Sequence, residues 1–138
     1  DTRSPEQALY ALSAILFHEL AHARDSFPAA SVANPDSNLS PADLGPQLLE
    51  LSVSRTLHNS SPLQDETLLE LAKVMYLGKT ASAELKAITA SAAGALLEGD
   101  GANDDYAYTS QQEDSAMLFE ENALVRALEL LQDECRNL

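Results

Sequence analysis

The sequence predicts an all-α fold in a single domain that spans residues 1–138. Serine residues that can cap a helix recur along the chain, and three of them stand directly before a proline, a favoured first residue of a helix. No stretch alternates apolar and polar residues in the manner of a β-strand, and aromatic residues make up only 5% of the chain. A chain of this length can bury one hydrophobic core, which argues against two full domains.

The first two helices are predicted by capping serines. Ser4 and Ser40 each precede a proline, and each has a polar residue three positions later that completes the start signal. The segments that follow are of helical length and carry apolar residues at helical spacing. We therefore expect helices near 5–25 and 42–58.

Three more helices follow from similar signals. Ser61 again precedes a proline, and Gly78 is typical of the residue that ends a helix. The alanine-rich segment after Gly78 favours a helix that packs closely against its neighbours. Ser110 has Glu113 three residues later, which is the pattern of a capping box. In chain order, these signals predict helices near 62–77, 80–97 and 110–134.

Two connections are predicted to be long, exposed loops. Residues 26–40 are rich in proline and asparagine, and residues 98–109 are acidic and contain glycine. Residues 100–105 have the oxygen-rich composition of a calcium loop but do not match the alternating EF-hand pattern. A solvated acidic loop is therefore the favoured interpretation of that segment.

The charge balance excludes some partners. The chain carries 8 Lys and Arg residues against 22 Asp and Glu residues, a formal net charge of −14 at pH 7. Such a chain repels phosphate backbones, so we expect no nucleic-acid partner. The longest apolar runs are too short to cross a bilayer, so we expect no membrane span. The single cysteine, Cys135, cannot form an internal disulfide and leaves the compartment open.

One motif carries chemistry. The segment from His18 to His22 reads HELAH, which matches HExxH, and it lies where we expect a helix. Residues four apart lie one turn above each other, so the two imidazoles point the same way and can bind one metal ion, with Glu19 beside them. Zinc hydrolysis needs this arrangement. The alternative is a histidine pair that is solvated, or hydrogen-bonded within a core.

The turns before this motif favour the metal site. Only three histidines occur in the chain, and two of them fall at this spacing. The preceding turns are strongly apolar, which predicts a helix that is buried along much of its length. The apolar residues concerned are Leu9, Leu12, Ile15 and Leu16.

A zinc hydrolase also needs a third protein ligand and an open position for water. His58 is one candidate. Glu113, in the first turn of the last expected helix, is the stronger one. The alternative role of Glu113 is structural, because it is also the third helical residue of the capping box that Ser110 begins.

These residues resemble the gluzincin zinc metallopeptidases, in which a glutamate on a later helix completes the HExxH site. Tyr106, Thr109 and Glu113 match the pattern Tyr-x-x-Thr-x-x-x-Glu. This pattern is similar to the segment that supplies a catalytic tyrosine and the third zinc ligand in anthrax lethal factor-like catalytic domains. The segment from His18 to Asp25 matches HExxHxxD, which is common in that group. The resemblance covers these two segments and leaves the middle of the chain unmatched.

The resemblance implies a role for each matched residue. His18, His22 and Glu113 would bind Zn²⁺, Glu19 would be the general base, and Tyr106 would donate a hydrogen bond to the oxyanion. Tyr108 is the alternative phenol.

Carboxylates around the site would orient its ligands. Asp25 shares the face of the two histidines and is a candidate to accept an imidazole N–H, with a solvated helix end as its alternative. Met117 stands one turn after Glu113, where such peptidases usually carry a further carboxylate. Asp114 and Glu120 are the candidates to replace it.

The resemblance also implies a β-sheet before the HExxH helix, whose edge strand binds substrate. The chain begins at Asp1 without a methionine or a leader, which we interpret as the start of a processed or excised piece. We therefore expect the sheet on a missing segment or on a partner chain, or else a reduced helical form of the fold.

The sequence as a whole thus predicts a zinc-dependent metallopeptidase that acts on a peptide or protein substrate through an activated water molecule. We expect the HExxH helix to pack against the C-terminal helix that carries the third ligand. The alternative is a non-catalytic, zinc-stabilised helical interaction module of a larger protein. Survival of the general base Glu19 favours the enzyme.

Overall fold

The computed structural model describes residues 3–29 and 38–136, with the backbone alone at 41 and at 131–136. Seven α-helices and one 3-10 helix make up this part of the chain, and no strand occurs within it. The all-α prediction is therefore confirmed. In chain order the elements are α1 (Pro5–Ser26), α3 (Pro41–Glu50), α4 (Val53–Ser60), α5 (Glu66–Leu77), α6 (Ala83–Lys86), α7 (Ala90–Asp100), the 3-10 helix η1 (Asp105–Thr109) and α8 (Gln111–Arg136).

The first and last predicted helices match α1 and α8 to within about two residues. Ser4 caps α1, since its hydroxyl accepts a hydrogen bond from the N–H of Gln7 at 3.3 Å. Ser40 caps α3 in the same way through the N–H of Asp43 at 3.3 Å. These capping serines act as the sequence predicted.

The helix predicted near 42–58 is two helices, and Ser52 is the reason. Its hydroxyl accepts from the N–H of Arg55 at 3.1 Å and donates to the carbonyl of Leu49 at 2.7 Å. Ser52 therefore ends α3 and caps α4 in one step. A serine in the middle of an apolar segment competes with the helical hydrogen bonds, which the periodicity did not reveal.

The helices predicted near 62–77 and 80–97 also need correction. No helix begins at Ser61, because α5 starts at Glu66 under the cap of Asp65, whose carboxylate accepts from the N–H of Leu68 at 2.9 Å. The second segment is split into α6 and α7, because Ser82 and Thr89 each cap a separate helix start. Both errors come from hydroxyl or carboxylate side chains that end one series of helical backbone hydrogen bonds and begin another.

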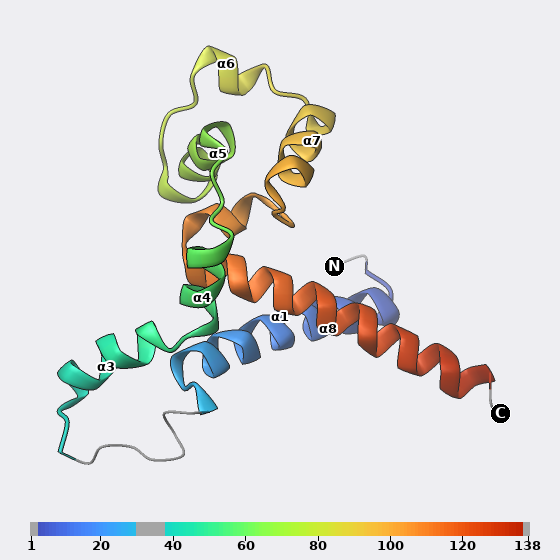
Figure 1. Ribbon diagram of the computed structural model, residues 1–138. Helices are drawn as coiled ribbons and strands as arrows, with labels where there is room; N and C mark the ends of the chain where they lie inside the picture. Colours follow the sequence, from blue (N-terminus) through green and yellow to red (C-terminus); the bar gives the residue numbers. More distant parts are fainter. Residues whose placement is uncertain (1–2, 30–37, 137–138) are drawn as a thin grey trace.

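The helices α1 and α8 lie side by side and antiparallel, while α5, α6 and α7 form a separate group at the other end of the molecule (Figure 1). The helix α4 packs against α8 close to where α8 begins. The prediction that the HExxH helix packs against the C-terminal helix is therefore confirmed. This pairing brings the end of α1 to the start of α8.

The prediction that α1 is buried along much of its length is wrong. Its buried residues are Ala21 and Asp25, near its C-terminal end. The apolar residues of its earlier turns are between 58% and 66% exposed, because α8 lies along one side of α1 and no other described residue covers the opposite side. These residues are Leu9, Leu12, Ile15 and Leu16. We call them the apolar face of α1.

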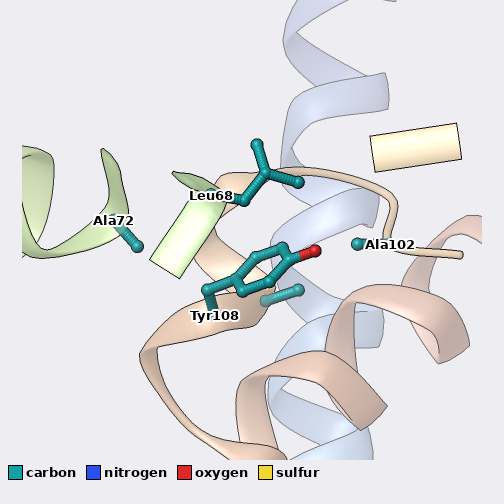
Figure 2. Packing of buried hydrophobic residues seen from close by; sticks show 5 residues of the cluster. Leu68, Ala72, Ala102 and Tyr108 are labelled. Atoms are coloured by element: carbon teal, nitrogen blue, oxygen red, sulfur yellow. The ribbon is translucent and has the colours of Figure 1, made fainter. Parts of the chain in front are cut away.

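The main hydrophobic core lies between α5, η1 and the segment before η1 (Figure 2). Leu68 and Ala72 of α5 pack against Ala102, Ala107 and Tyr108. The prediction of an exposed loop at 98–109 is therefore wrong. Because three small or aromatic side chains of this segment are buried, it forms part of the core.

Of the two predicted loops, the one at 26–40 lies largely outside the described residues. The other is organised by Asp100, whose carboxylate accepts from the Tyr108 hydroxyl at 2.5 Å. The same oxygen accepts from the backbone N–H groups of Gln64 and Asp65 at 2.7 and 2.9 Å. Asp100 thus joins the end of α7 to η1 and to the start of α5.

These contacts make the stability dependent on pH. Burial alone would raise the pKa of Asp100, but the hydrogen bonds from Tyr108, Asp65 and Gln64 outweigh it and hold that pKa below its usual value. A lowered carboxylate pKa stabilises the fold above the unfolded-state pKa of about 3.9. This contribution is lost as the pH falls through the folded-state pKa.

We predict that Asp100→Asn lowers the free energy of unfolding by about 1–3 kcal/mol at pH 7, because donors in the core lose a charged acceptor. Urea unfolding at pH 7 and at pH 3 measures the effect. The wild type should lose more stability than Asp100→Asn on acidification. Glu98→Gln, an exposed change on the same helix, is the matched control. Equal acid sensitivity of wild type and Asp100→Asn would contradict this role.

Candidate metal centre

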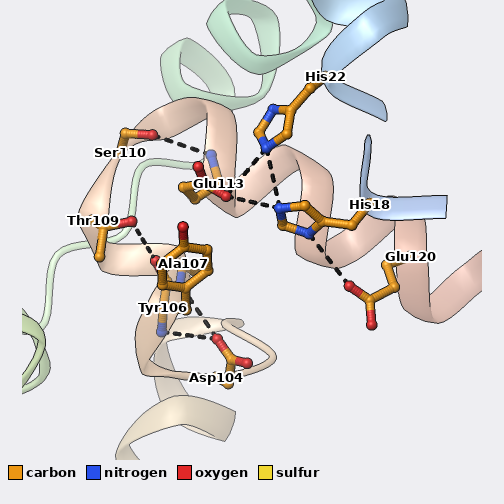
Figure 3. A network of polar contacts seen from close by, with 9 residues as sticks. All are labelled: His18, His22, Asp104, Tyr106, Ala107, Thr109, Ser110, Glu113 and Glu120. Carbon is orange, nitrogen blue, oxygen red and sulfur yellow. Dashed lines mark hydrogen bonds and ion pairs between the residues drawn. The ribbon is translucent and has the colours of Figure 1, made fainter. Parts of the chain in front are cut away.

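Three side chains predicted to bind a metal converge where α1 meets α8 (Figure 3). The Nε2 atom of His18 lies 3.0 Å from Oε2 of Glu113 and 3.1 Å from Nε2 of His22. The Nε2 atom of His22 lies 3.3 Å from the same Glu113 oxygen. One potential ligand atom from each residue therefore points to a common centre.

Local structure explains how each residue reaches this centre. His18 and His22 lie one turn apart on α1, so their rings share a face, with centroids 4.7 Å apart. Glu113 lies in the first turn of α8, where its backbone N–H donates to the Ser110 hydroxyl at 3.2 Å. Its carboxylate is turned toward the histidines. The helix cap and the metal-site position of Glu113 are therefore compatible, although the sequence presented them as alternatives.

A second carboxylate of α8 lies against His18. Oε2 of Glu120 lies 3.3 Å from Nδ1 of His18, on the opposite side of the ring from Glu113. A neutral imidazole that donates its Nδ1–H to Glu120 presents a lone pair at Nε2. That lone pair then faces the oxygen lone pairs of Glu113 at 3.0 Å. A metal ion bound between the two atoms would make this contact favourable.

The geometry fits a zinc ion. Ligand atoms bonded to a tetrahedral zinc at about 2.0 Å lie about 3.3 Å apart. The three separations here, from 3.0 to 3.3 Å, are close to that spacing. Two imidazoles and one carboxylate are also a donor set found in catalytic zinc sites, which keep a fourth position open. Among the described residues, this is the one group of three or more such side chains that could hold a metal ion.

Tyr106 lies beside the cluster. Its ring centroid is 6.2 Å from that of His18, and its hydroxyl is directed toward Glu113 (Figure 3). Burial, and then the nearby negative charges of Glu113 and Glu19, raise the pKa of Tyr106 above its usual value. The phenol therefore keeps its proton at neutral pH and can donate it in a hydrogen bond. Its ring is held by an edge-on contact with Tyr76, with centroids 4.9 Å apart.

Glu19 lies on α1 between the two histidines in sequence and is exposed. Its carboxylate is therefore accessible to solvent. Its negative charge is one of those that raise the pKa of Tyr106.

Asp25 lies in a different contact. Its two carboxylate oxygens accept from the N–H and the hydroxyl of Ser54 at 2.8 and 2.6 Å. Asp25 and Ser54 are both buried. Both donors to the Asp25 carboxylate thus lie at the start of α4. Asp25 therefore connects α4 to α1 and does not bond to an imidazole.

Asp114 also points away from the histidines, because on a helix it lies about 100° around the axis from Glu113. It is buried beside His58, in a pocket between α4, α5 and α8. His58, the other candidate for the third ligand, is therefore not in the metal cluster. The hydroxyl of Tyr108, the alternative phenol, donates a hydrogen bond to Asp100.

Glu120, one of the two carboxylates considered for this position, is the one that lies against His18, and Tyr76 was not predicted to lie at the site. Glu120 lies seven residues after Glu113, two turns along the same face of α8, so helical spacing could have ranked it above Asp114. No sequence signal marked Tyr76, because its contact with Tyr106 joins α5 to η1, which are distant in sequence.

Comparisons with known protein families, with curated proteins and with solved structures give no match. Within the described residues, no helix is both long enough and apolar enough to cross a bilayer.

Proposed function

We propose that this chain is a zinc-dependent metallopeptidase of the gluzincin type, which hydrolyses peptide bonds through an activated water molecule. The observation that carries the proposal is the convergence of His18, His22 and Glu113 on one centre, from two helices that the HExxH motif and the helix cap predict separately. Tyr106 lies beside that centre, and Glu19 follows the ligand His18 directly in sequence. This is the residue set that the resemblance to gluzincins implies.

Zinc bound by the two histidines and Glu113 would polarise the scissile carbonyl and make the attacking water more acidic. Glu19 accepts the proton of that water and passes it to the leaving amine. The Tyr106 hydroxyl donates a hydrogen bond to the carbonyl oxygen as it gains negative charge. Glu120 accepts the Nδ1–H of His18, which holds that imidazole in the tautomer that leaves Nε2 free for the metal.

A second candidate function is a zinc-stabilised, non-catalytic interaction module. The apolar face of α1 favours it, because large exposed apolar surfaces often mark contacts with other chains. The same face is also compatible with an enzyme whose β-sheet lies on another segment or a partner chain. The two functions differ in whether Glu19 does chemistry.

Zinc affinity tests the role of the α8 carboxylates. We predict that Glu120→Gln weakens zinc binding roughly 10- to 100-fold, the usual effect of losing the partner that orients a histidine ligand. Competition with a chromophoric chelator measures the dissociation constant. Glu121→Gln, an exposed neighbour on the same helix, should bind zinc as the wild type does. Equal affinities of Glu120→Gln and Glu121→Gln would remove Glu120 from the site.

Peptide cleavage tests the enzyme directly. We predict that Glu19→Gln keeps the fold and the zinc content but loses at least about 100-fold in turnover, because an amide cannot accept the water proton. Cleavage of a mixed peptide library by the zinc-loaded protein, followed by mass spectrometry, gives the comparison. Cleavage by neither wild type nor variant would favour the interaction module, and undiminished turnover of Glu19→Gln would exclude Glu19 as the base.

The phenol has its own matched pair of variants. We predict that Tyr106→Phe lowers kcat roughly 100- to 1,000-fold and leaves KM and zinc content nearly unchanged, since it removes one oxyanion donor. Tyr108→Phe should change stability but not kcat per folded molecule, because its hydroxyl bonds to Asp100. A fall in kcat confined to Tyr108→Phe would show that the other tyrosine acts at the site.

A further inference from the structure

A pocket of about 170 Å³ lies next to the first turn of α8. Glu113 of the metal cluster belongs to the same turn but does not line this pocket. Its walls come from the end of α4, the segment that precedes α5, α5 itself, η1 and α8. Leu63, Leu69 and Ala107 form its apolar lining, and Asp114 and His58 contribute ionisable groups. We call it the Asp114 pocket.

Asp114 is unusual in this pocket because it is 5% exposed and its Oδ1 has no hydrogen-bond partner among the described residues. A buried carboxylate oxygen without a donor costs free energy, so native proteins rarely leave one in that state. A ligand that brings a positive charge and N–H donors would satisfy the oxygen.

The lining indicates which kind of cation fits. A divalent metal ion needs several oxygen or nitrogen ligands, whereas Asp114 is the only carboxylate of this pocket and much of the wall is apolar. A guanidinium or ammonium group on a methylene stem matches both parts, because its N–H groups reach the carboxylate while its stem packs on Leu63 and Leu69. The volume also suits such a group, since a cavity of about 150 Å³ accommodates a benzene ring.

We propose that the Asp114 pocket binds the guanidinium or ammonium group of a basic side chain, with Asp114 as its counter-ion. The chain's net charge of −14 attracts basic ligands over longer distances. No other carboxylate of the described residues combines this burial, an unpartnered oxygen and a place in a pocket wall, since Asp105, the other residue with such an oxygen, lines none of the pockets described.

The position of the pocket connects it with the proposed reaction. Asp114 follows the proposed zinc ligand Glu113, and Ala107 of the pocket wall follows Tyr106. The metal cluster and the Asp114 pocket are therefore built on the same two elements, η1 and the first turn of α8. If the chain is a peptidase, which rests on the proposed function, the pocket would select an arginine or lysine side chain near the cleaved bond.

Calorimetric titration with ethylguanidinium chloride tests the binding without any need for catalysis. The wild type should bind one equivalent saturably, and Asp114→Asn should bind it at least about 10-fold more weakly, because a charged acceptor becomes neutral. Asp105→Asn is the matched control, since it removes another buried, unpartnered carboxylate oxygen and should leave the affinity unchanged. Gln111→Glu adds a carboxylate to the pocket wall and should tighten binding.

The outcomes separate the possible ligands. The proposal is overturned by a wild type that does not saturate, or by equal affinities of the wild type and Asp114→Asn. It is also overturned if sodium ions displace the probe, because the pocket would then bind an inorganic cation equally well. If Asp114→Asn does not fold, the effect of Gln111→Glu decides instead: unchanged affinity overturns the proposal. Tighter binding of a capped arginine peptide than of ethylguanidinium, with no binding of its citrulline counterpart, identifies a peptide as the source of the group.

The same titration on His22→Ala separates this inference from the proposed function. That variant should bind ethylguanidinium with wild-type affinity, because His22 does not line the pocket. A chain that binds the probe in this way but cleaves no peptide would retain the Asp114 pocket and lose the peptidase proposal. A chain that cleaves peptides with no preference for arginine or lysine over citrulline or norleucine, and does not bind the probe, would do the reverse.

Discussion

The antiparallel contact between α1 and α8 is the constraint on which the candidate site depends. It brings Glu113 to within hydrogen-bond distance of His22, although 91 residues separate them in sequence. Ala21 on α1 and Ala116 on α8 are both buried, and small side chains allow two helices to approach closely. Because the two helices run in opposite directions, the same contact also sets Glu120 against the other nitrogen of His18.

This contact places His18 between two carboxylates of one helix, with a second imidazole next to it. Such an arrangement concentrates lone pairs in a partly buried space, where repulsion is screened less than in water. A bound cation would therefore stabilise the pairing of α1 with α8. A metal site at this position would contribute to the fold, in addition to any reaction that it supports.

Much of this arrangement follows from sequence. Spacing of four residues put His18 and His22 on one helix face, and the Ser110 cap fixed the turn that carries Glu113.

The sequence did not reveal that Ser52 breaks a predicted helix, because a capping serine and a helical serine look alike without their neighbours. It also mispredicted the apolar face of α1 as buried, since an apolar pattern shows which side of a helix avoids water but not whether a neighbour covers it. Helical spacing and the family resemblance suggested Asp25, and the resemblance suggested Asp114, whereas tertiary contacts direct these two residues to Ser54 and to a separate pocket.

We infer that two imidazoles and one carboxylate hold a single zinc ion between α1 and α8. X-ray absorption spectroscopy on the protein loaded with one equivalent of zinc tests this inference. We expect a first shell of only nitrogen and oxygen at about 2.0–2.1 Å, with the outer-shell scattering of two imidazoles. A sulfur ligand at about 2.3 Å, or a shell with no imidazole scattering, would contradict it.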